Sequence, residues 1–302
     1  MTLKALGSTE AAPLLLFKGG TSLSKGWGLI DRFSEDIDLA IKREGKFEIS
    51  STSKSQRERL RKISRKYIVE VMAQELDSNL SNLGMANYSV EAITTRQNLD
   101  GHIVAIDSDK DPTEIHVKYS SIIGGLHNYI TPRVKIEISC LSMHEPAMDR
   151  EINSYISQSM PEVDEAKVRF KTVLPSRTML EKIFLLNEEY TKDKPRVMRM
   201  SRHLYDLEKL MDTEFGVMAI SDYNLYKAII EHRRHYYALK YFDYDRHSPS
   251  TITIVPPSNI IKEWEEDYKN MVRSFIYGPS LSFPELINRI EELETRIRKI
   301  RL

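Results

Sequence analysis

The stretch Leu14–Ile41, LLLFKGGTSLSKGWGLIDRFSEDIDLAI, decides the fold of the N-terminal half. It begins with an apolar run at residues 14–17, which is typical of a short buried strand. Gly19 and Gly20 must end that strand, because paired glycines favour a turn and leave no side chain between the backbone and a ligand. A Gly-Gly turn is also a common plain connection, so the pair alone indicates little about function.

The residues after the glycine turn predict the start of a helix. Thr21 suits the N-cap of a helix from about Ser22 to Leu29. A strand, a glycine turn and a helix N-terminus together present backbone N–H groups to an anion, usually a phosphate. Lys25 lies one helical turn after Thr21, where its ammonium can reach the same anion. We therefore predict that Gly19, Gly20, Thr21 and Lys25 contact a phosphate group.

Two aspartates follow on a predicted strand. Apolar residues alternate with Asp36 and Asp38 over residues 36–41, so one strand face is apolar and the other carries both carboxylates. Neighbouring carboxylates repel each other, and a divalent cation between them removes that penalty. Mg²⁺ binds oxygen ligands and keeps open positions for phosphate oxygens. A solvated strand end with two acids gives the same pattern, but the preceding glycine turn favours a metal site at Asp36 and Asp38.

A two-metal site needs a further carboxylate. The candidate is Glu137, because residues 132–139 alternate so that Glu137 points away from the apolar face. A neighbouring strand would place it beside the aspartate pair, and an ordinary exposed strand glutamate is the equally simple alternative. Asp107, Asp109 and Asp111 lie in a turn-like sequence, where acids are common, and we leave them out of the site.

The pattern along the chain predicts an α+β protein with two domains. Strands are expected up to about residue 145, at 14–17, 36–41, 102–106, 114–119 and 133–140. Beyond that point only helices are expected, at 146–159, 161–171, 176–191, 196–213, 222–240, 257–274 and 284–301, with a loop at 243–257. We place the boundary after residue 147. Residues 1–147 then form a mixed sheet with flanking helices, and residues 148–302 form an all-helical domain.

Composition limits the functional classes. The 302 residues include 44 basic and 44 acidic side chains, so any nucleic-acid contact must come from a local patch. The single cysteine, Cys140, excludes an internal disulfide and fits a reducing compartment, and its apolar surroundings predict an inert core thiol. The sequence has neither an apolar run of membrane-spanning length nor a signal-peptide pattern. These features predict a cytoplasmic protein that does not contact membranes.

Two segments combine charge or aromatic character in ways that suit nucleic acid. Residues 54–66 predict a basic helix that could follow a phosphate backbone, and a solvated helix face is the equal alternative. From this helix we select Arg57, Arg61, Lys62 and Arg65 as candidates for RNA binding. Residues 232–237, HRRHYY, could stack on a single-stranded end, although packing of the aromatic rings within the protein is the simpler interpretation.

Two stretches within residues 14–41 resemble the sequences of a known family. FKGGTSLSK at residues 17–25 and RFSEDIDL at residues 32–39 resemble the nucleotidyltransferase toxins of the AbiEii/AbiGii group, within the DNA polymerase β-like superfamily. This resemblance implies a nucleotidyltransferase-type mixed sheet in the first domain. It also implies that the helical domain contributes to the active-site cleft and to acceptor binding.

The helical half carries two further motifs of that family. LEKIF at residues 180–184 resembles its lysine motif, and RHLYDL at residues 202–207 resembles its aspartate motif. The resemblance implies that Lys182 binds the triphosphate and that Asp206 positions the substrate or Lys182. From the residues alone, both would be ordinary surface charges. Arg32 either contacts the phosphate or the acceptor, or forms an ion pair at the start of its strand.

The resemblance also implies a function. A toxin of a toxin–antitoxin or phage-exclusion system, with a separately encoded antitoxin, would transfer a nucleoside monophosphate from NTP to a hydroxyl and release pyrophosphate. Mg²⁺, in a two-metal site of Asp36, Asp38 and Glu137, would assist the transfer. The expected acceptor is RNA, such as the 3′ end of tRNA. Two alternatives remain: an acceptor hydroxyl on a protein or a small molecule such as an aminoglycoside, or an inactive protein that only binds a nucleotide or a partner.

Overall fold

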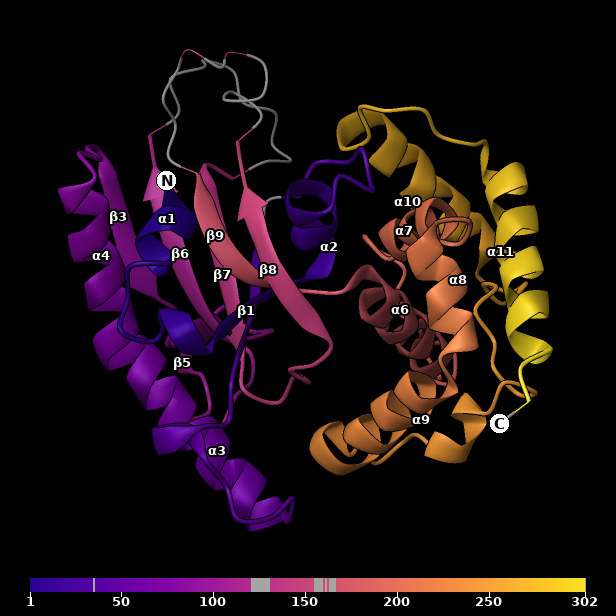
Figure 1. The fold of residues 1–302 in the computed structure, drawn as a ribbon, viewed down its shortest axis with the longest axis horizontal. Helices are drawn as coiled ribbons and strands as arrows, with labels where there is room; N and C mark the ends of the chain where they lie inside the picture. The colour runs from indigo at the N-terminus through magenta and orange to yellow at the C-terminus, as the bar shows by residue number, and fades with distance from the viewer. Residues whose placement is uncertain (35, 121–130, 155–159, 161, 163–166, 302) are drawn as a thin grey trace. The chain divides into compact units, whose positions relative to one another are not determined.

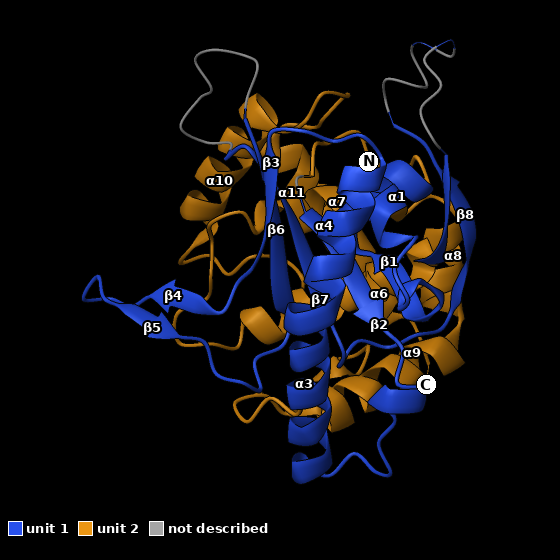
Figure 2. Cartoon of the chain, turned by 90° about the vertical axis from the view of Figure 1, so that its left-hand side faces the viewer, with its two compact units in different colours: residues 1–26, 35–172 blue, residues 27–34, 173–302 orange. Residues whose placement is uncertain are grey.

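The computed structural model describes residues 1–34, 36–120, 131–154, 160, 162 and 167–301. The chain forms two compact units, shown in different colours in Figure 2. Unit 1 comprises residues 1–26 and 35–172, and unit 2 comprises residues 27–34 and 173–302. The second unit therefore begins at residue 173 rather than near residue 147, and it includes a short segment from the N-terminal region.

A seven-stranded mixed sheet forms the centre of unit 1 (Figure 1). Its strand order is β3-β6-β7-β2-β1-β9-β8. Strand β2 is antiparallel to β1 and parallel to β7, while β9 is parallel to β1. The strands are β1 (Leu15–Lys18), β2 (Asp36–Ile41), β3 (Tyr88–Ala92), β6 (Thr113–Tyr119), β7 (Arg133–Ser139), β8 (Ala147–Ile152) and β9 (Val168–Val173). The mixed sheet of an α+β fold is thus confirmed.

The alternation in β2 and β7 produces the expected burial. Leu39, Ile136 and Ile138 are fully buried on the apolar face, which removes their side chains from water and stabilises the sheet. Helices of unit 1 supply further core residues such as Leu60 and Leu76. These helices are α1 (Thr2–Leu6), α3 (Lys54–Tyr67) and α4 (Ala73–Asn82), and a π-helical turn at Ile68–Met72 joins α3 to α4 (Figure 1).

The helices predicted at 146–159 and 161–171 are wrong where the structure describes these ranges. Strands β8 and β9 lie there instead, and residues 155–159, 161 and 163–166 are outside the described part of the chain. Phe170 and Thr172 are buried in β9, and Phe17 of β1 is the register partner of Thr172. Pairing with β1 in the sheet overrides the weak helical spacing of this segment.

A small antiparallel hairpin stands apart from the main sheet in unit 1 (Figure 2). It consists of β4 (Thr95–Gln97) and β5 (Ile103–Ala105), and only β5 was predicted. Strand β3 was also missed, because its side chains alternate only between exposed and half-buried positions and give no strong apolar period.

Unit 2 is helical beyond its first residues. It contains α6 (Pro175–Glu189), α7 (Ser201–Leu210), α8 (Glu214–Ser221), α9 (Tyr223–His232), α10 (Ile261–Ser274) and α11 (Phe283–Arg298). All but α8 were predicted, and a 3₁₀ turn at Tyr244–His247 lies in the predicted loop. No helix in the described part of the chain is long and apolar enough to cross a membrane.

Residues 27–34 are fixed within unit 2 by backbone and aromatic contacts. The Trp27 indole donates a hydrogen bond to the Val173 carbonyl at 3.0 Å and packs edge-on against Phe215, with ring centroids 5.0 Å apart. The Phe33 N–H donates to the Phe275 carbonyl at 2.7 Å. This segment therefore belongs structurally to the helices that follow much later in the sequence.

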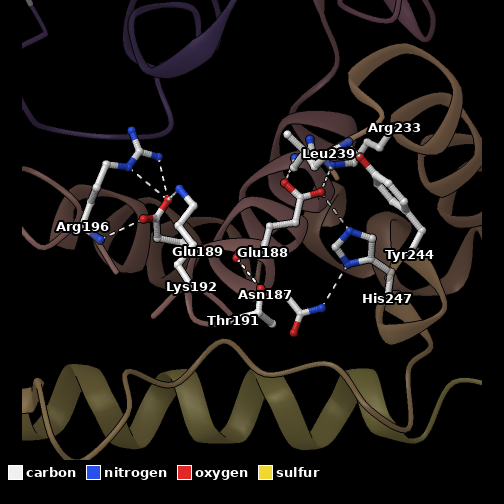
Figure 3. A network of polar contacts seen from close by, with 10 residues as sticks. All are labelled: Asn187, Glu188, Glu189, Thr191, Lys192, Arg196, Arg233, Leu239, Tyr244 and His247. Carbon is white, nitrogen blue, oxygen red and sulfur yellow. Dashed lines mark hydrogen bonds and ion pairs between the residues drawn. The ribbon is translucent and has the colours of Figure 1, made fainter. Parts of the chain in front are cut away.

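A buried polar network ties α6 to the following segments of unit 2 (Figure 3). Glu188 accepts hydrogen bonds from Arg233 Nε at 2.7 Å and from His247 Nε2 at 3.1 Å, and the Asn187 amide lies 3.1 Å from His247 Nδ1. Burial lowers the pKa of His247, which fits a neutral ring that donates from Nε2 and accepts at Nδ1. All four side chains are therefore satisfied within the fold.

Candidate active site

The turn from β1 into the first helix is tighter than predicted. The helical turn begins at Gly19 with Lys18 as its N-cap, and it continues through a π-helical turn at Ser22–Gly26. The predicted N-cap, Thr21, is wrong: this residue lies inside the first turn, and its hydroxyl donates a hydrogen bond to the Asp36 carbonyl. The left-handed backbone of Gly19, at φ +75°, allows the chain to pass directly from strand to helix.

Gly19 also makes room for a carboxylate. A Cβ at this position would lie 2.1 Å from Oδ2 of Asp38, so the Asp38 side chain lies directly against the glycine. Only glycine meets both requirements, a positive φ and no side chain. The glycine turn at Gly19 and the aspartate strand β2 are thus in contact within unit 1.

Three carboxylates meet on adjacent strands. The parallel pairing of β2 and β7 makes Asp38 the register partner of Glu137 and Asp36 the partner of Lys135. Asp36 is buried, with 10% of its side chain exposed, while 26% of Glu137 is exposed. The neighbouring strand that would place Glu137 beside the aspartate pair is therefore confirmed. Lys18 of β1 is the register partner of Asp38 on the other side.

Lys135, which sequence analysis did not assign to the site, is a cation among these acids. Its Nζ donates to Glu137 Oε1 at 2.9 Å and lies 3.6 Å from Asp36 Oδ2. Burial alone would lower the pKa of Lys135, but Glu137, Asp36 and Glu114 together raise it. Burial alone would raise the pKa of Glu137, but the hydrogen bond and charge of Lys135 hold it below its usual value. Both groups therefore remain charged.

Unit 2 contains a second cluster, formed by residues distant in sequence. Asp206 accepts two hydrogen bonds from Arg32, to Oδ1 at 2.6 Å and to Oδ2 at 2.7 Å, and Lys182 Nζ lies 2.9 Å from Oδ2. Asp206 is fully buried, and Arg32 and Lys182 are nearly so. Solvent exposure of Lys182 and Asp206, the expectation from sequence pattern alone, is thus wrong. Arg32 forms a buried ion pair with Asp206, and its contact with a phosphate or with the acceptor stays a prediction.

The charges in this cluster do not cancel. Burial alone would raise the pKa of Asp206, but the charges of Arg32 and Lys182 bring it far below its usual value. Burial, followed by the charges of Lys182 and Arg202, holds the pKa of His203 well below 6.5. Neutral His203 can therefore accept a hydrogen bond at Nδ1, which lies 3.4 Å from Lys182 Nζ. Burial lowers the pKa of Lys182 and the charge of Asp206 opposes this shift. Protonated Lys182 and Arg32 together supply two positive charges against the single negative charge of Asp206.

The predicted basic helix is confirmed as α3, but three of its four arginines have partners in the fold. Arg65 is buried and donates to the Ile93 carbonyl at 3.2 Å, and Arg61 pairs with Asp109 at 3.0 Å. Arg57 donates to the Thr52 carbonyl. Three of the four selected candidates thus have partners in the fold. The exposed cations on this helix are Lys54, Arg59, Lys62 and Lys66, so Lys62 remains from the selected set.

The other features singled out in the sequence have structural roles. Cys140 is buried, and burial raises the pKa of its thiol, in line with an inert core residue. Asp111 accepts hydrogen bonds from the Ser139 hydroxyl at 2.6 Å and from the Cys140 N–H at 2.8 Å. In the 232–237 segment, His232 stacks on Tyr236 with ring centroids 4.5 Å apart, and both rings are half-buried.

Comparison with solved structures identifies a similar fold. The structure resembles MenT4, a nucleotidyltransferase toxin from Mycobacterium tuberculosis H37Rv, with a TM-score of 0.51 and 12% identity over 99% of this chain and 81% of that one. At this identity the likeness concerns the fold alone. No curated protein sequence matches.

The family follows from the sequence profile. Residues 2–289 match the family described as "Nucleotidyl transferase AbiEii toxin, Type IV TA system". The chain belongs to the AbiEii nucleotidyltransferase toxin family. It is therefore a nucleotidyltransferase toxin of a type IV toxin–antitoxin system, an enzyme with an NTP substrate and an antitoxin as its counterpart. The alternative of an inactive binding protein does not agree with this membership.

Proposed function

We propose that this enzyme transfers a nucleoside monophosphate from NTP to a hydroxyl of RNA, such as the 3′ end of tRNA, with Mg²⁺ bound at Asp36, Asp38 and Glu137. The observation that carries the proposal is the register of β2 and β7, which sets these three carboxylates on adjacent strands. NTP, RNA and Mg²⁺ are all abundant in the cytoplasm, where we place the reaction.

The donor atoms suit Mg²⁺. All three candidate ligands are carboxylates, and hard divalent ions prefer oxygen. All three lie on the neighbouring strands β2 and β7, and the absence of a side chain at Gly19 makes room for Asp38. Among the described residues, no three acidic, histidine or cysteine side chains lie together in a group that could hold a metal ion. Binding of Mg²⁺ therefore requires the three carboxylates to draw closer together, and phosphate oxygens of NTP would complete the set of oxygen ligands.

We assign NTP binding to two groups of residues. In unit 1, the backbone from Gly19 to Thr21 and the Lys25 ammonium contact phosphate oxygens, because a helix start after a glycine turn suits an anion. In unit 2, the excess positive charge of Arg32 and Lys182 attracts the triphosphate, and Asp206 fixes the orientation of both side chains. His203 supports Lys182 from a second side.

The reaction is a displacement at the α-phosphorus. The acceptor oxygen forms a bond to that phosphorus, the bond to the β-phosphate oxygen breaks, and pyrophosphate leaves. The acceptor hydroxyl loses its proton near Glu137, which acts either as the base or as a ligand of the second metal ion. Bound Mg²⁺ would supply charge neutralisation on the phosphates and on the departing pyrophosphate. Positioning by the glycine turn and by Lys182 accounts for the protein's other contribution.

The exposed face of α3 supports an RNA acceptor. Arg59, Lys62 and Lys66 recur at helical spacing and are all exposed, so they form a basic stripe on one side of the helix. Such a stripe can follow a phosphate backbone without reading its sequence. Half-buried Arg61 and buried Arg65 bond to other segments of unit 1 and so help to fix the helix that presents this stripe.

The test uses purified enzyme with each α-³²P-labelled NTP, Mg²⁺ and total cellular RNA. We expect one NTP to label a discrete RNA band, and Asp38→Asn to abolish that label. Label on protein or on a small molecule, with none on RNA, would overturn the RNA assignment and leave nucleotide transfer intact.

A further inference from the structure

Lys135 occupies a position that the proposed reaction does not use. It lies on β7, two residues before Glu137 and directly across from Asp36 in the register with β2. Its ammonium contacts the carboxylates of Glu137, at 2.9 Å, and Asp36, at 3.6 Å. These are two of the three proposed metal ligands, and only 23% of the Lys135 side chain is exposed. The contacts therefore form inside the site and not on an open surface.

The ammonium and a metal ion need the same oxygen atoms. A carboxylate oxygen that accepts a hydrogen bond from Nζ has fewer lone pairs for a cation. A divalent ion close to a protonated lysine also meets like-charge repulsion, which is strong in a partly buried site. Without any cation, however, the adjacent acids on β2 and β7 would repel each other. One lysine thus relieves repulsion in the metal-free protein and opposes the metal.

We propose that Lys135 is the built-in counter-ion of the metal site, and that its ammonium must leave Asp36 or Glu137 when a divalent ion binds. This inference rests on the proposed function, because it takes these carboxylates as the metal ligands. Lys135 weakens binding of the free ion. The ion then binds firmly only together with NTP, whose negative charge compensates for the lysine. Metal and NTP affinities are therefore coupled through this residue, and coupling of this kind is reciprocal.

The experiment measures Mn²⁺ binding to the full chain, by the loss of the free-ion electron paramagnetic resonance signal, at fixed ionic strength. We expect Lys135→Met to tighten Mn²⁺ binding about 5- to 20-fold in the absence of NTP, as for a lost contact between charged groups. The gain in Mn²⁺ affinity on adding a non-hydrolysable NTP analogue should shrink in the same variant. Lys135→Arg, which retains the charge, should stay within about twofold of wild type.

A matched control exists on the same sheet. Lys118 of β6 pairs with Glu91 of β3, and about half of each side chain is exposed. Lys118→Met removes an equal charge from another cross-strand pair and should leave Mn²⁺ affinity unchanged. Tighter binding in both variants would overturn the proposal, because it would reflect net charge alone.

A second measurement needs no variant. Acetic anhydride modifies the Lys135 amine faster once its carboxylate contacts are lost, so saturating Mn²⁺ with the NTP analogue should increase modification of this lysine, measured by mass spectrometry. Lys118 again serves as the reference. Unchanged Mn²⁺ affinity in folded Lys135→Met, or unchanged modification of Lys135, would overturn the counter-ion role while the metal site stands. If wild type binds no Mn²⁺ and Asp38→Asn has no effect, the proposed metal site fails as well.

Discussion

Replacement of Gly19 by alanine tests whether the glycine turn and the carboxylate site act as one structure. The new Cβ would lie 2.1 Å from Asp38 Oδ2 and 2.8 Å from Cγ, far inside contact distance. The carboxylate must therefore retreat by ~1 Å, a displacement that can cost about 100-fold in rate when it affects a catalytic group. The left-handed backbone, at φ +75°, adds about 1 kcal/mol of strain to the folded state.

The control is Gly84→Ala, because Gly84 has nearly the same backbone conformation, at φ +77°, and nothing within 4 Å of its added Cβ. Both variants should lose a similar small amount of stability from the backbone, measured by urea denaturation. Only Gly19→Ala should lose nucleotide transfer, by about 100-fold, and Mn²⁺ affinity with it. Wild-type transfer in Gly19→Ala, or equal losses of transfer in both variants, would refute the argument that Gly19 sets the position of Asp38.

Four further predictions follow from the site. Asp38→Asn should abolish labelling of RNA without changing the melting temperature, since its neighbours in β2 keep their packing. Asp206→Asn should lower the free energy of unfolding by about 3–5 kcal/mol in urea, because it leaves two buried cations with a neutral partner. Lys62→Glu combined with Lys66→Glu should raise the KM for RNA but not for NTP, and should reduce the salt dependence of binding by ~0.7–0.9 for each lost phosphate contact. The pKa of His203 is lower in the folded than in the unfolded state, so the stability it contributes is present above pH ~6.5 and is lost as pH falls. His203→Gln should therefore reduce the loss of stability between pH 7.5 and 5.5, and an unchanged pH slope would contradict the neutral state of this ring.

Sequence periodicity predicted the strands that carry the acidic residues, because an alternating pattern of strong β formers is compatible with few other secondary structures. It could not give the register of β2 and β7, which depends on how the whole sheet packs. The pairing of Asp38 with Glu137 therefore depended on an assumed neighbouring strand, and the contacts of Lys135 with Glu137 and Asp36 could not be predicted. The helix predicted at 161–171, where β9 lies, was wrong for the same reason. The strand that pairs with β9 is β1, which lies about 150 residues earlier in the sequence.

Sequence periodicity could not predict the cluster of Arg32, Lys182 and Asp206 in unit 2. Lys182 and Asp206 show the spacing of ordinary helix surfaces, and only the family resemblance raised them to candidates. Their burial follows from Arg32, which reaches them from the opposite end of the sequence. Tertiary packing brings such a charged triad together, so no local sequence pattern predicts it.

The segment 27–34 limits how this protein can be divided or recombined. It separates the glycine turn from the aspartate strand, yet it folds with helices that begin at residue 173. A fragment ending at residue 172 would expose Trp27 and Phe33 without their partners, and the remaining fragment would lack both. A chimera made with a relative by one exchange at this junction would pair Arg32 of one parent with the Asp206 position of the other. The two units therefore cannot be exchanged separately at a single junction. A functional chimera requires at least a second exchange, around residues 27–34, so that this segment and the later helices come from the same parent.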